Sequence, residues 1–107
     1  MKRFGQVIGI KPEHIAEYER LHAEVWAGVL ETITACNIRN YSIYRFQETL
    51  FAYFEYHGTD FAADMQKMAD DPTTQQWWAI CEPMQQELEG RAPGEHWANM
   101  PEVFHLD

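Results

Sequence analysis

The sequence has few of the features that mark secreted, membrane or metal-binding proteins. Its 107 residues include only two cysteines, Cys36 and Cys81, too few for a disulfide framework and without the spacing of a metal site. No apolar run approaches the roughly 20 residues that span a bilayer. The first residues have no small-residue cleavage site of the kind that follows a signal peptide. We therefore expect a cytoplasmic protein that is not bound to a membrane.

Positive charge is also scarce. Eight lysines and arginines stand against 17 aspartates and glutamates, which gives a formal net charge of −9 without a basic cluster. Such a charge repels phosphate backbones and anionic lipids, so we expect no nucleic acid among the partners. The sequence also lacks a glycine-rich phosphate loop, a dinucleotide fingerprint and a recognisable serine or cysteine nucleophile.

The residues that are present predict one domain over 1–107, with enough hydrophobic residues for one core. Residues 4–10 alternate as a strand does, with glycines on one side that something else approaches closely. A helix is expected from Pro12 to about Cys36, with Asn37 as a left-handed cap. Residues 39–46 and 50–57 predict a β-hairpin.

Two further helical segments and a last strand complete the expected order. Thr59 or Asp60 begins the first helix, Asp71 and Pro72 separate the two, and the second bends or ends near Pro83. Residues 88–99 are predicted as a loop, and 102–106 (EVFHL) as the closing strand. If residues 47 and 48 form the hairpin turn, one face holds Tyr41, Ile43, Ala52 and Phe54, and the other Asn40, Ser42, Tyr44, Phe51, Tyr53 and Glu55.

This order predicts an α+β fold, a ferredoxin-like sandwich in which a four-stranded antiparallel sheet carries its helices on one face. A chain of this length leaves the other face of the sheet uncovered. Aromatic residues occur on both faces of the predicted hairpin, so we expect a homodimer that packs sheet against sheet.

His22 lies in the middle of the apolar stripe of the first predicted helix, which runs through residues 15, 18, 22, 25, 29 and 33. A histidine in this position is either a core residue bonded to a carbonyl or a general acid–base group, because imidazole titrates near neutrality. Tyr18 lies one turn earlier, and so addresses the same small volume. If Tyr41 faces the helix, two phenols and an imidazole meet between helix and sheet.

Trp77 and Trp78 are adjacent and point about 100° apart on a helix, so one can fill the core while the other lines a pocket. Flat aromatic faces also bind the C–H side of sugar rings. Trp97 either closes a pocket or fixes the tail. A metal site built from His57, His96 and His105 with Glu55 or Glu102 is a weaker alternative, because these residues lack ligand spacing.

Together these motifs resemble the L-rhamnose mutarotase family. The resemblance rests on Tyr18 and His22 in YxxxH, the VW that follows, NYSIY around Tyr41, QxWW ending at Trp78, and the closing EVFHL. It implies a dimeric α+β barrel and a sugar 1-epimerase without a cofactor. It further implies that His22 is the proton donor and that Tyr18, Tyr41, Trp77 and Trp78 contact the sugar. Ala27 departs from the family, many members of which carry proline there.

The chemistry of anomer exchange agrees with these residues, because ring opening and closure require only proton transfers. The expected substrate is L-rhamnose, with L-fucose as the alternative. A haem-binding or cofactor-free monooxygenase on the same barrel remains open, because fold alone does not decide function. A sugar-binding module without catalysis is a third possibility.

Overall fold

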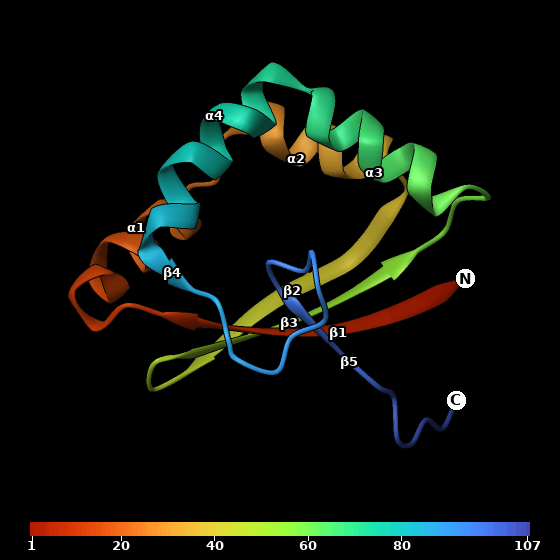
Figure 1. Ribbon diagram of the computed structural model, residues 1–107. Helices are drawn as coiled ribbons and strands as arrows, with labels where there is room; N and C mark the ends of the chain where they lie inside the picture. Colours follow the sequence, from red (N-terminus) through yellow and green to blue (C-terminus); the bar gives the residue numbers. More distant parts are fainter.

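An antiparallel sheet lies beneath four α-helices in the computed structural model, which describes residues 1–107 (Figure 1). The strands are β1 (Lys2–Ile10), β2 (Ile38–Phe46), β3 (Thr49–Tyr56), β4 (Gln85–Gln86) and β5 (Ala98–Met100). The helices are α1 (Ile15–Ala23), α2 (Ala27–Ala35), α3 (Phe61–Asp70) and α4 (Pro72–Cys81), with short 3₁₀ turns at Pro12–His14 and Glu82–Met84. None of the helices is long and apolar enough to cross a membrane.

The sheet has the strand order β2-β3-β1-β4, and β5 also pairs with β1. All pairings are antiparallel. In β1 the side chains of Phe4, Gln6 and Ile8 point toward the helices, opposite Phe54, Ala52 and Leu50 of β3. The alternation of β1 thus separates a helix-covered face from an outer face that carries its glycines. The predicted α+β sandwich with its helices on one face is confirmed.

The glycine side of β1 is closely approached at Gly9, as the sequence predicts. A Cβ atom at this position would lie 2.9 Å from the backbone oxygen of Gln86. Only glycine therefore allows β4 to approach this end of β1.

The hairpin has the predicted two-residue turn, since Phe46 pairs with Thr49 across Gln47 and Glu48. One irregularity interrupts it, because Arg39 pairs with Glu55 whereas Ser42 pairs with Tyr53. The extra residue forms a β-bulge at Asn40, whose φ of 52° lies in the left-handed region that asparagine tolerates. Tyr41 lies on the same face as Ile43, toward the helices, and its ring packs against Phe54. The predicted assignment of faces is confirmed.

The prediction of one continuous helix from Pro12 to about Cys36 is wrong. The chain leaves the helical conformation between Ala23 and Ala27, so the segment forms two helices, α1 and α2. Trp26 is extended there (φ −57°, ψ 135°) and places its ring 5.1 Å from that of Trp77, edge to face. Neither proline nor glycine marks this break. Packing of Val25 and Trp26 against the core outweighs local helix preference. Asn37, with φ 67°, does follow α2 as the expected left-handed residue.

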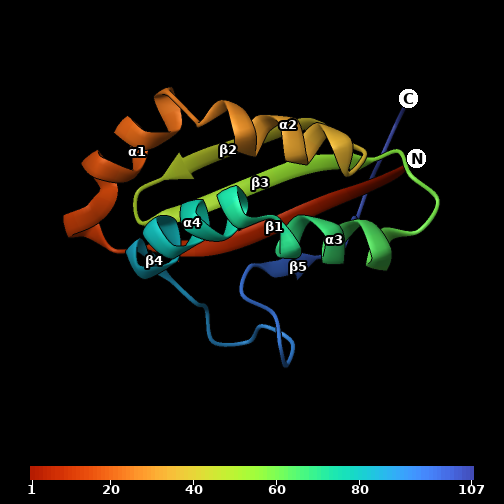
Figure 2. The same cartoon turned by 90° about the horizontal axis from the view of Figure 1, so that it is seen from above.

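The second pair of helices begins as predicted. The Asp60 carboxylate accepts a hydrogen bond from the backbone N–H of Ala63 and caps α3. Asp71 caps α4 by accepting from the N–H and hydroxyl of Thr74. Seen from above, α1 and α2 form one row over the sheet and α3 and α4 a second row (Figure 2).

The prediction of a closing strand at residues 102–106 is wrong. Residues 101–107 have no regular structure, and the free edge of β1 is already occupied by β4 and β5. Pro101 ends β5, because proline donates no ladder hydrogen bond. The side chain of Arg3 binds Glu102 at 2.9 and 3.1 Å. Beyond this ion pair the tail exposes Val103, Phe104 and Leu106.

The core has two parts. The larger cluster joins Ile8, Ile10 and Leu50 of the sheet to buried residues of the helices, among them Val29 and Trp77. The smaller cluster contains Ile38, Phe54 and Tyr56, with α3 packed against it. Side chains of both clusters line one cavity between sheet and helices. The fold therefore leaves a pocket inside its own core.

Candidate active site

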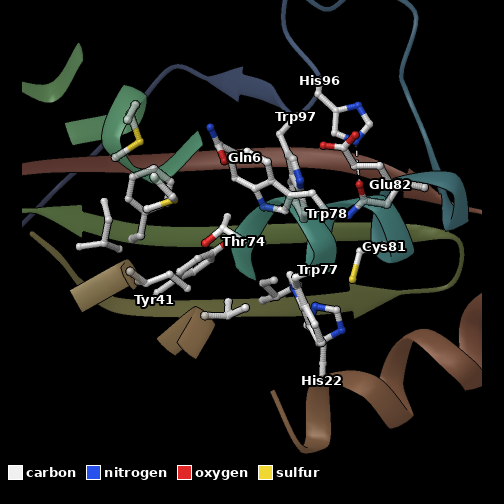
Figure 3. Close-up of a pocket in the computed structure, with 18 of the residues that line it drawn as sticks. Gln6, His22, Tyr41, Thr74, Trp77, Trp78, Cys81, Glu82, His96 and Trp97 are labelled. Carbon is white, nitrogen blue, oxygen red and sulfur yellow. Dashed lines mark hydrogen bonds between the residues drawn. The ribbon is translucent and has the colours of Figure 1, made fainter. Parts of the chain in front are cut away.

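The cavity has a volume of about 490 Å³, and 14 of the 20 residues that line it are hydrophobic. Tyr18 and His22 of α1, Tyr41 of β2, and Trp77 and Trp78 of α4 all contribute to its wall. Figure 3 shows His22 beside Trp77, with His96 and Trp97 across the pocket in that view. A small-molecule site commonly combines such an apolar wall with a few polar groups. The five predicted site residues thus meet around one pocket.

His22 is half-buried and fixed in one tautomer. Its Nδ1 lies 2.8 Å from the backbone oxygen of Tyr18. Because a carbonyl oxygen only accepts, Nδ1 carries the proton, and the neutral ring presents a basic nitrogen at Nε2. Nε2 has no hydrogen-bond partner in the protein and is not fully buried. Burial lowers the pKa of His22, which favours the neutral ring. His22 is bonded to a carbonyl, as the first of the two possibilities expects, and it also lines the pocket, so the acid–base role stays a prediction.

Tyr18 supports the imidazole with its ring as well as its backbone. The two rings stack with centroids 4.0 Å apart. The hydroxyl of Tyr18 accepts a hydrogen bond from Gln85 at 3.2 Å. Burial raises the pKa of Tyr18 well above its ordinary value, so the phenol keeps its proton. It is therefore a hydrogen-bond donor rather than a base.

Tyr41 reaches the same cavity from the opposite layer. Although 42% of its surface is exposed, burial of the hydroxyl raises its pKa to about 12. The hydroxyl has no hydrogen-bond partner within the protein, and its raised pKa arises from burial and from the nearby Cys81. Tyr41 thus offers a second protonated phenol to a bound molecule.

The adjacent tryptophans of α4 differ in how deeply they are buried. Trp77 is 5% exposed and belongs to the core, with its ring 5.2 Å from that of His22, edge to face. Trp78 is half-buried and packs only partly against the core. Both nevertheless line the cavity. Trp97 also lines it.

No sequence pattern identifies the glutamines at the cavity, Gln85 and Gln6, as site residues. Gln85 is buried, and its Oε1 lies 2.7 Å from Nε2 of His96. Gln6 enters from β1, with its amide donating to Asn99. Gln85 stands in an ordinary stretch, MQQ, directly after the 3₁₀ turn and at the start of β4. No spacing rule identifies such a residue.

Nucleophile and metal chemistry have little support in the geometry. Cys81 lines the cavity, but burial raises its pKa to about 11, so it remains a thiol near neutrality. Nowhere do three histidine, cysteine, aspartate or glutamate side chains come together as a metal site would require. His57, His96 and His105 instead bond separately to Glu55, Gln85 and Asp107.

The fold thus encloses an aromatic pocket lined by an imidazole with a free nitrogen and by two protonated phenols, groups that can exchange protons or hydrogen-bond with a bound molecule. Residues 3–106 match the sequence profile of the L-rhamnose mutarotase family. The chain belongs to this family, and it is an isomerase acting on carbohydrates. This confirms the predicted family and enzyme class and leaves no support for the monooxygenase alternative.

Comparison with individual proteins supports the same family. The L-rhamnose mutarotase of Oceanobacillus iheyensis is 30% identical over 109 residues, which cover all of both chains. The L-fucose mutarotase of Xanthomonas campestris is 35% identical over 96 residues, or 86% of this chain and 76% of the relative. A crystal structure of an L-rhamnose mutarotase from Formosa agariphila superposes with a TM-score of 0.78, at 18% identity and over all of both chains. At that identity the superposition bears on the fold alone.

Proposed function

We propose that this protein interconverts the α and β anomers of L-rhamnose, with His22 as the group that moves the proton. The observation that carries the proposal is the locked tautomer of His22. Its Nδ1 is held by the Tyr18 carbonyl, so the basic Nε2 is the nitrogen left for a bound sugar. Residues 1–107 act as one mutarotase domain in this proposal.

The reaction begins when Nε2 of His22 takes the proton of the anomeric hydroxyl. The bond between C1 and the ring oxygen breaks, its electron pair goes to the ring oxygen, and C1 becomes an aldehyde carbon. The imidazolium returns its proton to the ring oxygen, which makes His22 the proton donor that the family resemblance implies. Rotation about C1–C2 and reversal of these steps give the other anomer. No proton is gained or lost in the cycle.

The tyrosines assist by hydrogen bonding. Burial raises the pKa of both Tyr18 and Tyr41, so each hydroxyl can donate to a sugar oxygen that gains negative charge. Trp77 and Trp78 offer flat faces to the C–H side of the ring.

The apolar wall favours a 6-deoxy sugar, which carries a methyl group where other hexoses carry a hydroxyl. One methyl in a hydrophobic pocket is worth about 1–3 kcal/mol of discrimination. L-Fucose shares this methyl, and the similarity to an L-fucose mutarotase favours it as the second candidate substrate.

Saturation-difference NMR tests the function directly. We expect the protein to exchange the anomers of L-rhamnose well above the rate in buffer, and those of L-fucose more slowly. Binding without exchange would instead identify a sugar-binding module. Faster exchange of L-fucose would reverse the proposed substrate order.

The pH dependence of kcat/KM follows from His22. Its neutral form is the active base, and its pKa lies below the ordinary value of about 6.5. Activity should therefore persist below pH 6.5 and fall only as the pH drops through the lowered pKa. Measurement between pH 4.5 and 8, within about two units of that value, checks this. A midpoint above 6.5 would contradict the assigned role.

We also propose that the protein is a homodimer joined through the outer face of the sheet. No helix covers this face (Figure 1), where Tyr44, Phe46 and Phe51 are exposed. Exposed apolar surface of this kind is typical of a contact between copies. Light scattering should give about twice the chain mass of 12.6 kDa.

Phe51→Glu should convert the dimer to a monomer, because it places a charge in the middle of the proposed interface. Ile80→Glu is the control, since Ile80 is similarly exposed but lies on α4, on the other side of the molecule. An unchanged mass for Phe51→Glu, or dissociation by Ile80→Glu, would refute this interface.

A cytoplasmic location is part of the proposal, and both cysteines are free and buried, as suits a reducing compartment.

A further inference from the structure

A chain of hydrogen bonds extends from the pocket to the loop before β5. The Nε2 amide group of Gln85 donates to the hydroxyl of Tyr18 at 3.2 Å. On its other side, Oε1 of Gln85 lies 2.7 Å from Nε2 of His96. Gln85 is buried, and all three residues line the cavity. The loop is thereby connected to the phenol beside His22.

These bonds have a direction. An amide oxygen only accepts and an amide nitrogen only donates, so Nε2 of His96 carries a proton and the oxygen of Tyr18 is an acceptor toward Gln85. The hydroxyl proton of Tyr18 is not used within the protein, because Tyr18 donates to no protein atom. With Gln85 on its acceptor side, the hydroxyl is left to donate to a molecule in the cavity.

The orientation of the Gln85 amide depends on His96. If the amide flipped, its oxygen would accept the Tyr18 proton and withdraw it from the pocket. His96 opposes the flip by donating to Oε1, and its other nitrogen, Nδ1, lies 3.4 Å from the Glu87 carboxylate. Arg91 approaches the same carboxylate at 3.4 Å. The imidazole thus lies between the Gln85 amide and the Glu87 carboxylate.

Tyr18 is placed better than Tyr41 to act together with His22. Its carbonyl fixes the His22 tautomer and its ring stacks on the imidazole. Tyr41 lies on the sheet and is bonded to neither residue.

We infer that Gln85 and His96 are positioning residues that hold the Tyr18 hydroxyl as a hydrogen-bond donor to the sugar beside His22. This inference rests on the proposed mutarotase function. Neither residue touches the reacting atoms in this role. Their effect passes through the direction of one phenolic proton.

Gln85→Glu is the sharpest variant, because glutamate has nearly the same shape and still accepts from His96. Its second oxygen, however, accepts the Tyr18 proton. We expect kcat/KM for L-rhamnose to fall about tenfold, the effect of one lost hydrogen bond, with kcat changing more than KM. Gln86→Glu is the matched control, because it introduces the same change of charge one residue later, at a side chain that is exposed. It should retain wild-type activity.

Substitutions at His96 test the same inference at a half-buried position. His96→Gln keeps a donor toward Oε1 of Gln85 and should retain most activity, whereas His96→Leu should lose about as much as Gln85→Glu. If the two His96 variants are equally impaired, the inferred donation to Gln85 is refuted. This pair decides the question even if Gln85→Glu does not fold.

A double-mutant cycle separates positioning from a general structural effect. Gln85→Glu should lower the rate no further in a Tyr18→Phe background, because the phenolic proton is already absent. Additive losses would overturn the inference. Equal activity of Gln85→Glu and Gln86→Glu would also overturn it while leaving the mutarotase function intact. Absence of exchange in the wild type would instead refute the function itself.

Discussion

His22→Ala should reduce enzyme-catalysed anomer exchange of L-rhamnose by about 10²–10⁴-fold, the range that a positioned acid–base group supplies. The variant loses the imidazole that stacks on Tyr18 and keeps a nitrogen free at the wall of the pocket. Saturation-difference NMR at equal protein concentration measures the loss. Sugar binding should weaken much less than exchange, because the aromatic wall remains.

Two controls make this result specific. His14→Ala removes a histidine that does not line the cavity, and this variant should exchange anomers at the wild-type rate. Adding free imidazole to His22→Ala should restore part of the activity, because the deleted side chain leaves space for it. Undiminished exchange in His22→Ala would leave His22 as a core residue bonded to a carbonyl.

Trp77→Ala should lower the free energy of unfolding by about 3–5 kcal/mol, the usual cost of removing a large buried aromatic side chain. Trp77 is 5% exposed and packs edge to face against His22 and Trp26. Its loss also frees the imidazole that it contacts, so activity should fall together with stability. Urea unfolding followed by circular dichroism measures the change.

Trp78→Ala is the informative comparison at the neighbouring position. Trp78 is half-buried and packs only partly against the core, so its removal should cost clearly less stability. Its main effect should be a higher KM for L-rhamnose, through the loss of an aromatic face. Equal destabilisation by both variants would contradict the expectation that Trp77 mainly stabilises the fold and Trp78 mainly contacts the sugar.

The sequence predicted most of the elements, because their signals are local. Alternating β-branched and aromatic residues identified the hairpin, Thr59 or Asp60 was expected to begin α3, and Asp71 and Pro72 were expected to separate α3 from α4. The helix through residues 24–26 was predicted wrongly, since no proline or glycine interrupts it. The strand at 102–106 was also predicted wrongly, because the alternation of EVFHL says nothing about whether a sheet edge is free.

The five candidate site residues were found from spacing and from family resemblance, and they line one cavity. Their roles toward a sugar stay predictions. Gln85 could not have been found in this way. Its importance depends on contacts with Tyr18 and His96, which lie 67 and 11 residues away in the chain.

The sequence by itself determined the α+β class, the presence of the hairpin and the helix face that carries His22, because side-chain periodicity and capping act over a few residues. Only the tertiary structure decided which way the Tyr18 hydroxyl points, because Gln85, which donates to it, lies 67 residues away in the chain. The structure also decided which nitrogen of His22 is free, through the side-chain conformation that brings Nδ1 to the Tyr18 carbonyl one turn away. Hydrogen-bond direction and burial are properties of the folded protein, and the chemistry of the site follows from them.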